Sequence, residues 1–302
     1  MNRISKGIYP TMITPFTDDG KIDYNAVEEL LEWYIKEGVD GVFAVCQSSE
    51  MFWLEDDEKL KLLKFIVDRA GGRISVVSSG HTDSDIRHTT EYMKKCYETG
   101  TEALVLISCL LAGGDADEYE FKKNTEYVMS ELPNAQLGMY ECPYPYKYVL
   151  PDSLVSWLAD TERFGFIKDT CCDINTIKRR IEIINGTPTM LFNANTATLL
   201  QSLRCGCDGY SGIMANFHPS LYKWLYENRN DSRADEIGHI LTASALIENV
   251  SYPMCAKHYL KRHINIGCKC RKPGQELSSA NLMDIASAAY IADVIAERII
   301  SK

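Results

Sequence analysis

The sequence predicts an α/β protein, namely a (β/α)8 TIM barrel followed by a C-terminal helical extension. Short apolar runs alternate with amphipathic stretches along the 302 residues, which indicates parallel strands joined by right-handed crossovers. There are eight such apolar runs, and this number favours a closed barrel. An open doubly wound sheet is the alternative. Roughly 85 residues follow the last run, too many for one barrel helix.

The eight predicted strands are short, apolar and bounded by polar or glycine-containing segments, as buried strands of a parallel sheet are. They are Gly7–Thr14, Gly41–Val45, Ile74–Ser79, Ala103–Ser108, Gln136–Glu141, Gly165–Asp169, Thr189–Ala194 and Gly209–Met214.

Amphipathic stretches between these strands predict helices at Tyr24–Lys36, Asp56–Arg69, Ser84–Glu98, Asp117–Glu131 and Asp173–Ile184. Asp23 and Asp83 are the expected N-caps of the first and third of these helices. We predict a barrel over residues 1–218 and an extension over 219–302. Its expected helices are Pro219–Asn228, Ala234–Glu248, Pro253–His263 and Ser279–Ile299. No linker rich in glycine, proline or serine precedes the extension, so we expect it to pack on the barrel.

Composition excludes several classes of function. The net charge of −10 argues against binding to nucleic acid or to an anionic membrane surface. No apolar run reaches the length of a transmembrane helix, and the N-terminal residues do not resemble a signal peptide. The eleven cysteines are scattered and odd in number, which does not suggest a disulfide framework. We therefore expect a cytoplasmic protein with reduced thiols.

Lys168 carries the strongest chemical signal. It is the only charged residue before Asp169 in an apolar run that is predicted as a strand. Burial disfavours the ammonium form and lowers the pKa of a lysine, and the neutral amine is a nucleophile that forms Schiff bases with keto acids. The alternative is a lysine whose amine reaches out to water from the strand end.

Other candidate residues follow the strands at the same predicted end of the barrel, where barrel enzymes hold their active sites. Tyr140 ends the strand before that of Lys168 and could transfer protons, although a tyrosine that only packs is the commoner case. Ser48 and Ser49 follow the second strand and offer hydroxyls and successive backbone N–H groups to a carboxylate. The alternative for both serines is a polar turn.

The strand-end residues belong to a longer pattern. It consists of Gly7 to Phe16, Asp19-Gly20, Asp23, Gly41-Val42, Ser48-Ser49-Glu50, Leu54, Glu58, Gly80, Tyr140, Pro143, Ile167 to Thr170, Asp173 and Asp208-Gly209. This pattern resembles the dihydrodipicolinate synthase/N-acetylneuraminate lyase family of Schiff-base-forming class I aldolases, over essentially the whole chain. The family fold is a barrel with a C-terminal helical extension.

The resemblance implies a Schiff-base-forming lyase or aldolase that acts on pyruvate or a related 2-keto acid. Lys168 would form the imine and Tyr140 would relay protons. Ser48 and the N–H of Ser49 would hold the carboxylate, with Ser48 also bonded to the Tyr140 hydroxyl. Gln47 would join this substrate-binding group, and the backbone around Ser211 would line the site. The resemblance also implies a homodimer or homotetramer and no metal or organic cofactor.

Several departures from the family pattern leave the aldehyde partner open. Cys46 and Ser49 replace two glycines, and Gln47 replaces a hydroxyl residue. Ser108-Cys109-Leu110 lacks the relay tyrosine of dihydrodipicolinate synthases, and Pro145 stands where they carry an arginine. Sialic-acid lyases carry an Asp-Glu pair where this chain has Asn195-Thr196-Ala197.

These departures leave several functions open. They are 4-hydroxy-tetrahydrodipicolinate synthase itself, a related 2-keto acid dehydratase and a catalytically silent keto-acid-binding relative. Efficient turnover of aspartate semialdehyde or of N-acetylneuraminate is not expected. Leu110, Cys142, Pro143 and Tyr144 instead suggest a more apolar pocket wall for a smaller or less charged partner.

Three further features of the sequence have structural explanations. The pairs Cys171-Cys172, Cys205/Cys207 and Cys268/Cys270 do not have the usual spacing of zinc ligands, so packing thiols are favoured over a metal-dependent barrel enzyme. His81 follows the third strand and is either a polar pocket residue or a helix cap. The basic run Lys257 to Arg271 is expected to be a solvated helix face near a subunit contact.

Overall fold

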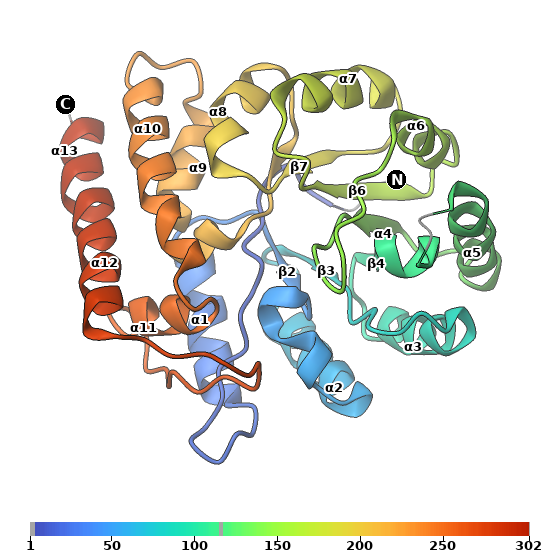
Figure 1. Ribbon diagram of the computed structural model, residues 1–302, viewed down its shortest axis with the longest axis horizontal. Helices are drawn as coiled ribbons and strands as arrows, with labels where there is room; N and C mark the ends of the chain where they lie inside the picture. Colours follow the sequence, from blue (N-terminus) through green and yellow to red (C-terminus); the bar gives the residue numbers. More distant parts are fainter. Residues whose placement is uncertain (1–3, 115–116, 302) are drawn as a thin grey trace.

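The computed structural model describes residues 4–114 and 117–301 and contains one sheet of eight parallel strands. Neighbouring strands follow the order β1-β8-β7-β6-β5-β4-β3-β2, and helices alternate with them along the chain (Figure 1). The predicted (β/α)8 barrel is confirmed. The strands are β1 (Gly7–Ile8), β2 (Gly41–Ala44), β3 (Ser75–Ser78), β4 (Ala103–Ile107), β5 (Leu137–Tyr140), β6 (Phe164–Asp169), β7 (Leu191–Asn193) and β8 (Gly209–Tyr210).

The barrel closes where the segment after β1 meets β2. The N–H of Phe43 donates to the carbonyl of Pro10 at 2.9 Å, and the N–H of Met12 donates to the carbonyl of Phe43 at 3.0 Å. Each predicted strand overlaps an observed one. β6 begins one residue before the predicted start, at Phe164, whereas Gly7–Thr14 and Gly209–Met214 were predicted too long. Proline has no N–H to continue a ladder, and residues 213–216 fold into a short 3-10 helix.

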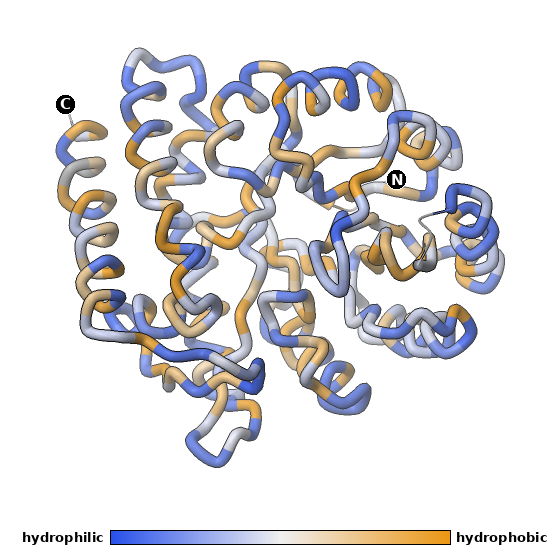
Figure 2. The backbone as a smooth tube through the Cα atoms, viewed as in Figure 1, coloured by the Kyte–Doolittle hydropathy of each residue, from blue (hydrophilic) through white to orange (hydrophobic). Residues whose placement is uncertain are grey.

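Helices surround the strands on the outside of the barrel. They are α1 (Tyr24–Lys36), α2 (Asp56–Ala70), α3 (Ile86–Glu98), α4 (Ser108–Ala112), α5 (Glu118–Glu131), α6 (Asp152–Asp160), α7 (Ile174–Ile184) and α8 (Thr196–Arg204). Their outward sides are largely hydrophilic, as α5 and α7 show in Figure 2. Asp23 caps α1 as predicted. The N-cap predicted for α3 is wrong by two residues. Asp85 is the N-cap and accepts from the N–H groups of Arg87 and His88, whereas Asp83 accepts from the N–H of Asp85.

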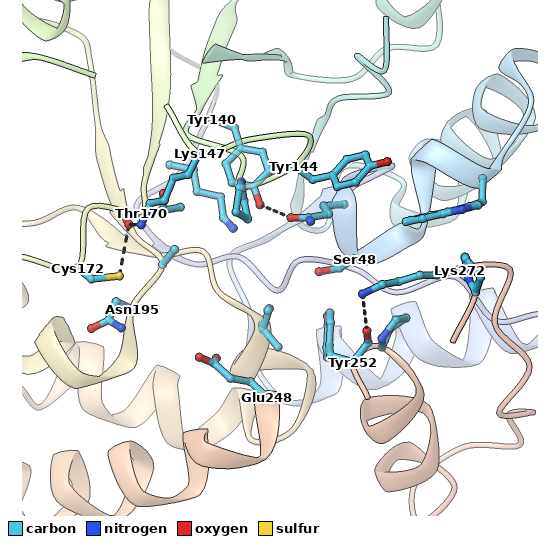
Figure 3. Close-up of a pocket in the computed structure, with 18 residues that line it drawn as sticks. Ser48, Tyr140, Tyr144, Lys147, Thr170, Cys172, Asn195, Glu248, Tyr252 and Lys272 are labelled. Atoms are coloured by element: carbon cyan, nitrogen blue, oxygen red, sulfur yellow. Dashed lines mark hydrogen bonds between the residues drawn. The ribbon is translucent and has the colours of Figure 1, made fainter. Parts of the chain in front are cut away.

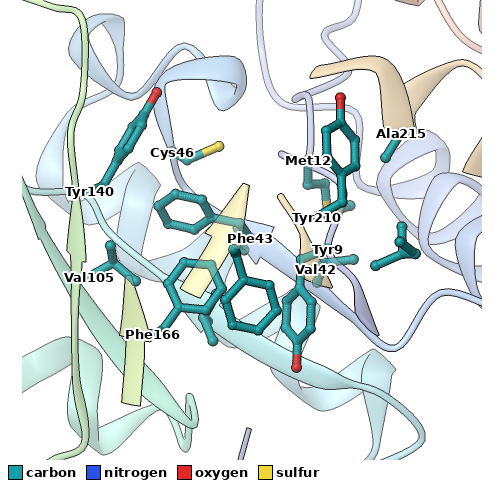
Figure 4. Close-up of a cluster of buried hydrophobic side chains, with 14 of the residues drawn as sticks. Tyr9, Met12, Val42, Phe43, Cys46, Val105, Tyr140, Phe166, Tyr210 and Ala215 are labelled. Carbon is teal, nitrogen blue, oxygen red and sulfur yellow. The ribbon is translucent and has the colours of Figure 1, made fainter. Parts of the chain in front are cut away.

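Aromatic rings fill the inside of the barrel below the strand ends (Figure 4). The centroid of the Phe166 ring is 4.4 Å from that of Phe192 and 5.8 Å from those of Tyr9 and Phe43. The Phe43 ring in turn meets Tyr140 edge-on at 5.6 Å. These contacts tie Tyr140 to the packed interior, so its ring has little freedom to move.

The C-terminal elements gather on one side of the barrel, next to α8 and α1 (Figure 1). They are α9 (Pro219–Glu227), α10 (Ala234–Ser244), the 3-10 helix η4 (Ala245–Asn249), α11 (Met254–Leu260), α12 (Ser279–Tyr290), the π-helix η5 (Ile291–Ala296) and α13 (Glu297–Ile300). The division at residue 218 stays a prediction, and α9 packs against β1. Within the described ranges, no helix is long and apolar enough to cross a membrane.

Candidate active site

Lys168 and Tyr140 lie side by side at the carboxyl ends of β6 and β5. The two residues are paired in register across these strands, and their side chains are only 3% and 5% exposed. The Nζ atom of Lys168 lies 4.3 Å from the centroid of the Tyr140 ring. The carboxyl ends of parallel strands meet at the same rim of a barrel, so residues that end neighbouring strands lie close together.

Burial sets the protonation state of Lys168. Desolvation lowers the pKa of its amine to about 8, although the nearby groups Cys46, Cys142 and Glu248 oppose this shift. A lysine in water keeps its proton until about pH 10.4. The buried amine is therefore neutral in a useful fraction of molecules near neutral pH, which makes it a nucleophile.

The Tyr140 hydroxyl is held by Gln47 and not by Ser48. It donates to Oε1 of Gln47 at 3.2 Å, while the hydroxyl of Ser48 donates to Oγ1 of Thr11 at 2.9 Å. The expected hydrogen bond between Ser48 and Tyr140 is therefore wrong, because the glutamine side chain is long enough to reach the phenol first. Burial raises the pKa of Tyr140 well above its usual value, so the group is a phenol and can donate a proton.

The loop after β2 divides its residues between the cavity and the protein interior. Gln47 and Ser48 line the cavity. The N–H of Ser49 donates to the carbonyl of Cys46 at 3.0 Å, and its hydroxyl donates to the carbonyl of Met12 at 2.6 Å. Both donors of Ser49 thus hold the turn, and Ser49 is not among the residues that line the cavity.

Ser211 lies just beyond β8 and is fully buried. Its N–H donates to the carbonyl of Asn193 at 2.9 Å, and its hydroxyl finds no partner within the described ranges. The cavity lining does not include it. His81 is also buried away from the cavity, where its Nδ1 accepts from the N–H of Ile107 at 3.0 Å and burial lowers its pKa to about 4.

The cavity that Lys168 lines has a volume of about 450 Å³. Figure 3 shows its walls, with Tyr140 on one side and Glu248 on the other. Most of its walls come from the barrel strand ends and loops, and the C-terminal extension contributes a smaller part. The lining residues are Gln47, Ser48, Trp53, Tyr140, Pro143, Tyr144, Lys147, Lys168, Thr170, Cys172, Ala194, Asn195, Ile213, Glu248, Tyr252, Pro253, Lys272 and Pro273.

Charged residues that the sequence reasoning missed stand in these walls. Lys147 donates to the carbonyl of Thr170, and Lys272 donates to the carbonyl of Tyr252 at 3.1 Å. Glu248 adds a carboxylate from η4. The expected apolar wall is therefore only partly correct: Pro143 and Tyr144 line the cavity, but Leu110 and Cys142 do not. The place of Lys147 in the cavity could have been predicted, because it lies close to Pro145 in sequence. The places of Glu248 and Lys272 depend on how the extension packs on the barrel.

A buried ionic cluster beneath the site fixes the ends of β5 and β6. Arg180 of α7 binds Glu141 at 2.7 Å and also binds Asp169, and all three side chains are fully buried. Glu141 accepts from the N–H groups of Leu150 and Thr170, each at 2.8 Å. The residues directly after Tyr140 and Lys168 are thereby locked together.

A second buried cluster joins the loop after β2 to the extension. Glu50 accepts from Nζ of Lys257 at 2.6 Å and from the N–H groups of Arg271 and Lys272 at 2.6 and 2.7 Å. Arg271 also forms a two-bond contact with Glu58, each bond 2.6 Å long. The basic run is therefore not simply a solvated face. Lys257 is fully buried, because Glu50 neutralises it inside the protein.

The described residues hold no group of three or more metal-ligating side chains, and all eleven cysteines are unpaired. The prediction that the protein needs no metal or cofactor stays a prediction.

Comparison with known proteins gives a consistent set of similarities. The model of the Dihydrodipicolinate synthetase family matches residues 4–289. A 4-hydroxy-tetrahydrodipicolinate synthase of Acetivibrio thermocellus is 26% identical over 92% of this chain and 94% of its own. One from Brachyspira hyodysenteriae is 23% identical over 91% and 94%.

Solved structures share the fold. The wild-type sialic acid aldolase of Ruminococcus gnavus superposes with a TM-score of 0.86 at 18% identity, over 97% of this chain and 99% of its own. The N-acetylneuraminate lyase of Fusobacterium nucleatum, solved with pyruvate, gives 0.82 at 22% identity, over 94% and 95%.

Proposed function

Because the chain belongs to the dihydrodipicolinate synthetase family, we propose that it is a Schiff-base-forming lyase or aldolase that acts on pyruvate or a related 2-keto acid. The observation that carries the proposal is the buried amine of Lys168, with its lowered pKa, next to the hydroxyl of Tyr140. A buried lysine without a carboxylate partner is costly, and its retention at a barrel mouth is best explained by covalent chemistry.

The reaction begins when the neutral amine of Lys168 attacks the ketone carbon of the keto acid. The carbinolamine takes up a proton, loses water and becomes a protonated imine. The imine nitrogen withdraws electrons, so the bond between the carbon next to the former ketone and the hydroxyl-bearing carbon beyond it can break. That hydroxyl loses its proton, the fragment leaves as an aldehyde, and an enamine remains on Lys168. In the reverse direction the enamine attacks an aldehyde. Tyr140, which is protonated and has its ring directly beneath the amine, supplies and recovers the protons of these steps.

The carboxylate of the keto acid belongs beside Ser48 and Gln47, which line the cavity next to Lys168. Ser49 and Ser211 support this subsite from behind, because both are buried and outside the lining. Their proposed contribution is to fix the backbone of the loops that follow β2 and β8, and no direct contact with the substrate is required of them.

A catalytically silent keto-acid-binding relative is the second candidate. Gln47 favours this candidate, because its amide oxygen accepts the hydrogen bond from the Tyr140 hydroxyl. A serine or threonine hydroxyl at this position could relay a proton, whereas an amide oxygen has no proton to relay. Borohydride reduction in the presence of pyruvate separates the candidates. The lyase gains the mass of a reduced pyruvate adduct at Lys168, whereas a relative that binds without an imine gains none.

The finer properties remain part of the proposal. We expect the second substrate to be a small aldehyde and turnover of aspartate semialdehyde or N-acetylneuraminate to be weak. A homodimer or homotetramer is supported by the exposed apolar side chains of Leu282, Met283 and Tyr290 on α12. A cytoplasmic location is supported by the unpaired cysteines, since thiols stay reduced there.

A further inference from the structure

Glu248 is a carboxylate in the cavity that has no hydrogen-bond or ion-pair partner among the residues that the structure describes. It lies on η4 of the extension, lines the cavity and is partly buried. Within the described ranges it accepts no hydrogen bond and forms no ion pair. The other acidic residues close to the site, Glu50, Glu141 and Asp169, all have such partners. An unpaired carboxylate in a confined space loses hydration that nothing in the protein replaces.

Asn195 stands on the same side of the cavity as Glu248 (Figure 3). Its Oδ1 caps α8 by accepting from the N–H and the hydroxyl of Thr198, at 3.0 and 3.1 Å. These two bonds fix the orientation of the amide, with Oδ1 toward the helix N-terminus. Its Nδ2 donates to no other residue in the part of the chain that the structure describes. Among the described residues, this side of the cavity therefore offers a free acceptor on Glu248 and a free donor on Asn195.

A hydroxyl group is the ligand that satisfies both, because it donates one hydrogen bond and accepts others. An ammonium group fits less well, since Lys147, Lys272 and the protonated imine at Lys168 already supply positive charge. A carboxylate would meet the charge of Glu248 directly. Burial raises the pKa of Glu248, and the charge of Lys168 opposes this shift.

We propose that Glu248, together with Asn195, determines specificity for the second substrate by binding a hydroxyl on the carbon chain of the aldehyde. This inference rests on the proposed function, because it assigns the far end of the same cavity. The acceptor would come from the extension and not from the β7 loop, where Thr196 turns away to the hydroxyls of Tyr210 and Tyr222.

The test is a comparison of matched aldehydes with pyruvate as the common donor. Acetaldehyde is paired with glycolaldehyde, and propionaldehyde with lactaldehyde. The wild-type kcat/KM should be at least about tenfold higher for the hydroxylated member, as expected for a hydrogen bond to a charged group. Glu248→Leu should bring this ratio to within about threefold of one, and Glu248→Gln should give an intermediate ratio. Asn249→Leu, at an exposed neighbouring position, should keep the wild-type ratio.

The outcomes separate the two proposals. A wild-type protein that shows no borohydride-trapped pyruvate at Lys168 overturns the proposed function and this inference with it. A protein that is trapped, but prefers neither aldehyde of a pair, overturns only the inference. The same holds if Glu248→Leu and Glu248→Gln both retain the wild-type ratio. Thermal melting of each variant identifies any that fail to fold, and the glutamine variant, which preserves shape, then decides.

Discussion

The hydroxyl of Tyr140 donates to the amide oxygen of Gln47, 3.2 Å away, while its ring lies beneath the amine of Lys168. An amide oxygen accepts a hydrogen bond but has no proton of its own to pass on. Gln47 therefore cannot relay a proton from Tyr140 to another group. Tyr140 exchanges its proton with the substrate, and any exchange with water takes place through the open cavity.

Replacing Tyr140 by phenylalanine should slow turnover by roughly 10²- to 10⁴-fold, which is the usual contribution of a general acid–base group. The ring contacts with Phe43 remain, so the fold should be kept. Single-turnover kinetics with pyruvate measure the effect. Tyr119→Phe, at an exposed position on α5, is the control. A loss of less than about threefold would remove Tyr140 from the mechanism.

Replacing Lys168 by alanine should abolish turnover and the borohydride-trapped adduct without unfolding the protein, because the variant removes a buried amine that has no ion-pair partner among the described residues. Intact-mass spectrometry after reduction with pyruvate detects the adduct. Lys147→Ala serves as the matched control, since it removes another lysine of the same cavity and should leave the adduct at Lys168 in place. Normal turnover in Lys168→Ala would refute the imine mechanism.

Imine formation should accelerate as the pH rises from about 6 and should level off above about 8, because the pKa of Lys168 is lowered to about 8 and only the neutral amine reacts. The same shift makes the folded state gain stability with rising pH between about 8 and 10.5, where the unfolded chain still binds the proton that the folded one has lost. Stopped-flow trapping across this range tests the first statement. A profile that rises only near pH 10 would show an unperturbed lysine.

Removing one partner of the ion pair between Glu50 and Lys257 should lower the free energy of unfolding by about 3–5 kcal/mol, because the other charge is left buried. Lys257→Met and Glu50→Gln are the single variants. Urea denaturation measures both, with Lys261→Met as an exposed control on the following turn. The double variant should lose less than the sum of the two, and strictly additive losses would contradict the coupling.

Local sequence patterns were sufficient to predict the barrel and the pairing of Lys168 with Tyr140 at its rim. Lys168 and Tyr140 end successive apolar runs, and parallel strands bring such ends to one rim. The direction of individual side chains in the loop after β2 could not be predicted. Ser48 and Ser49 are adjacent and chemically identical, yet only Ser48 faces the cavity.

The contribution of the extension could not be predicted either, since it depends on packing between segments far apart in sequence. Glu248 and Lys272 follow Lys168 by many residues, and nothing in the local pattern around them indicates a cavity. Lys257 appeared to belong to a solvated run because its partner, Glu50, lies at the other end of the chain.

The cavity is divided between two stretches of the chain. The strand ends hold the amine and the phenol, whereas η4 and the segment around Lys272 form the opposite wall. Mutations in the second stretch can therefore change which aldehyde is accepted while the imine-forming groups stay as they are. Glu50 limits this freedom, because its bonds to Arg271 and Lys272 set how far that wall can shift before the loop beside Ser48 shifts with it. New specificities should therefore arise more readily at Glu248 than at residues 271–272.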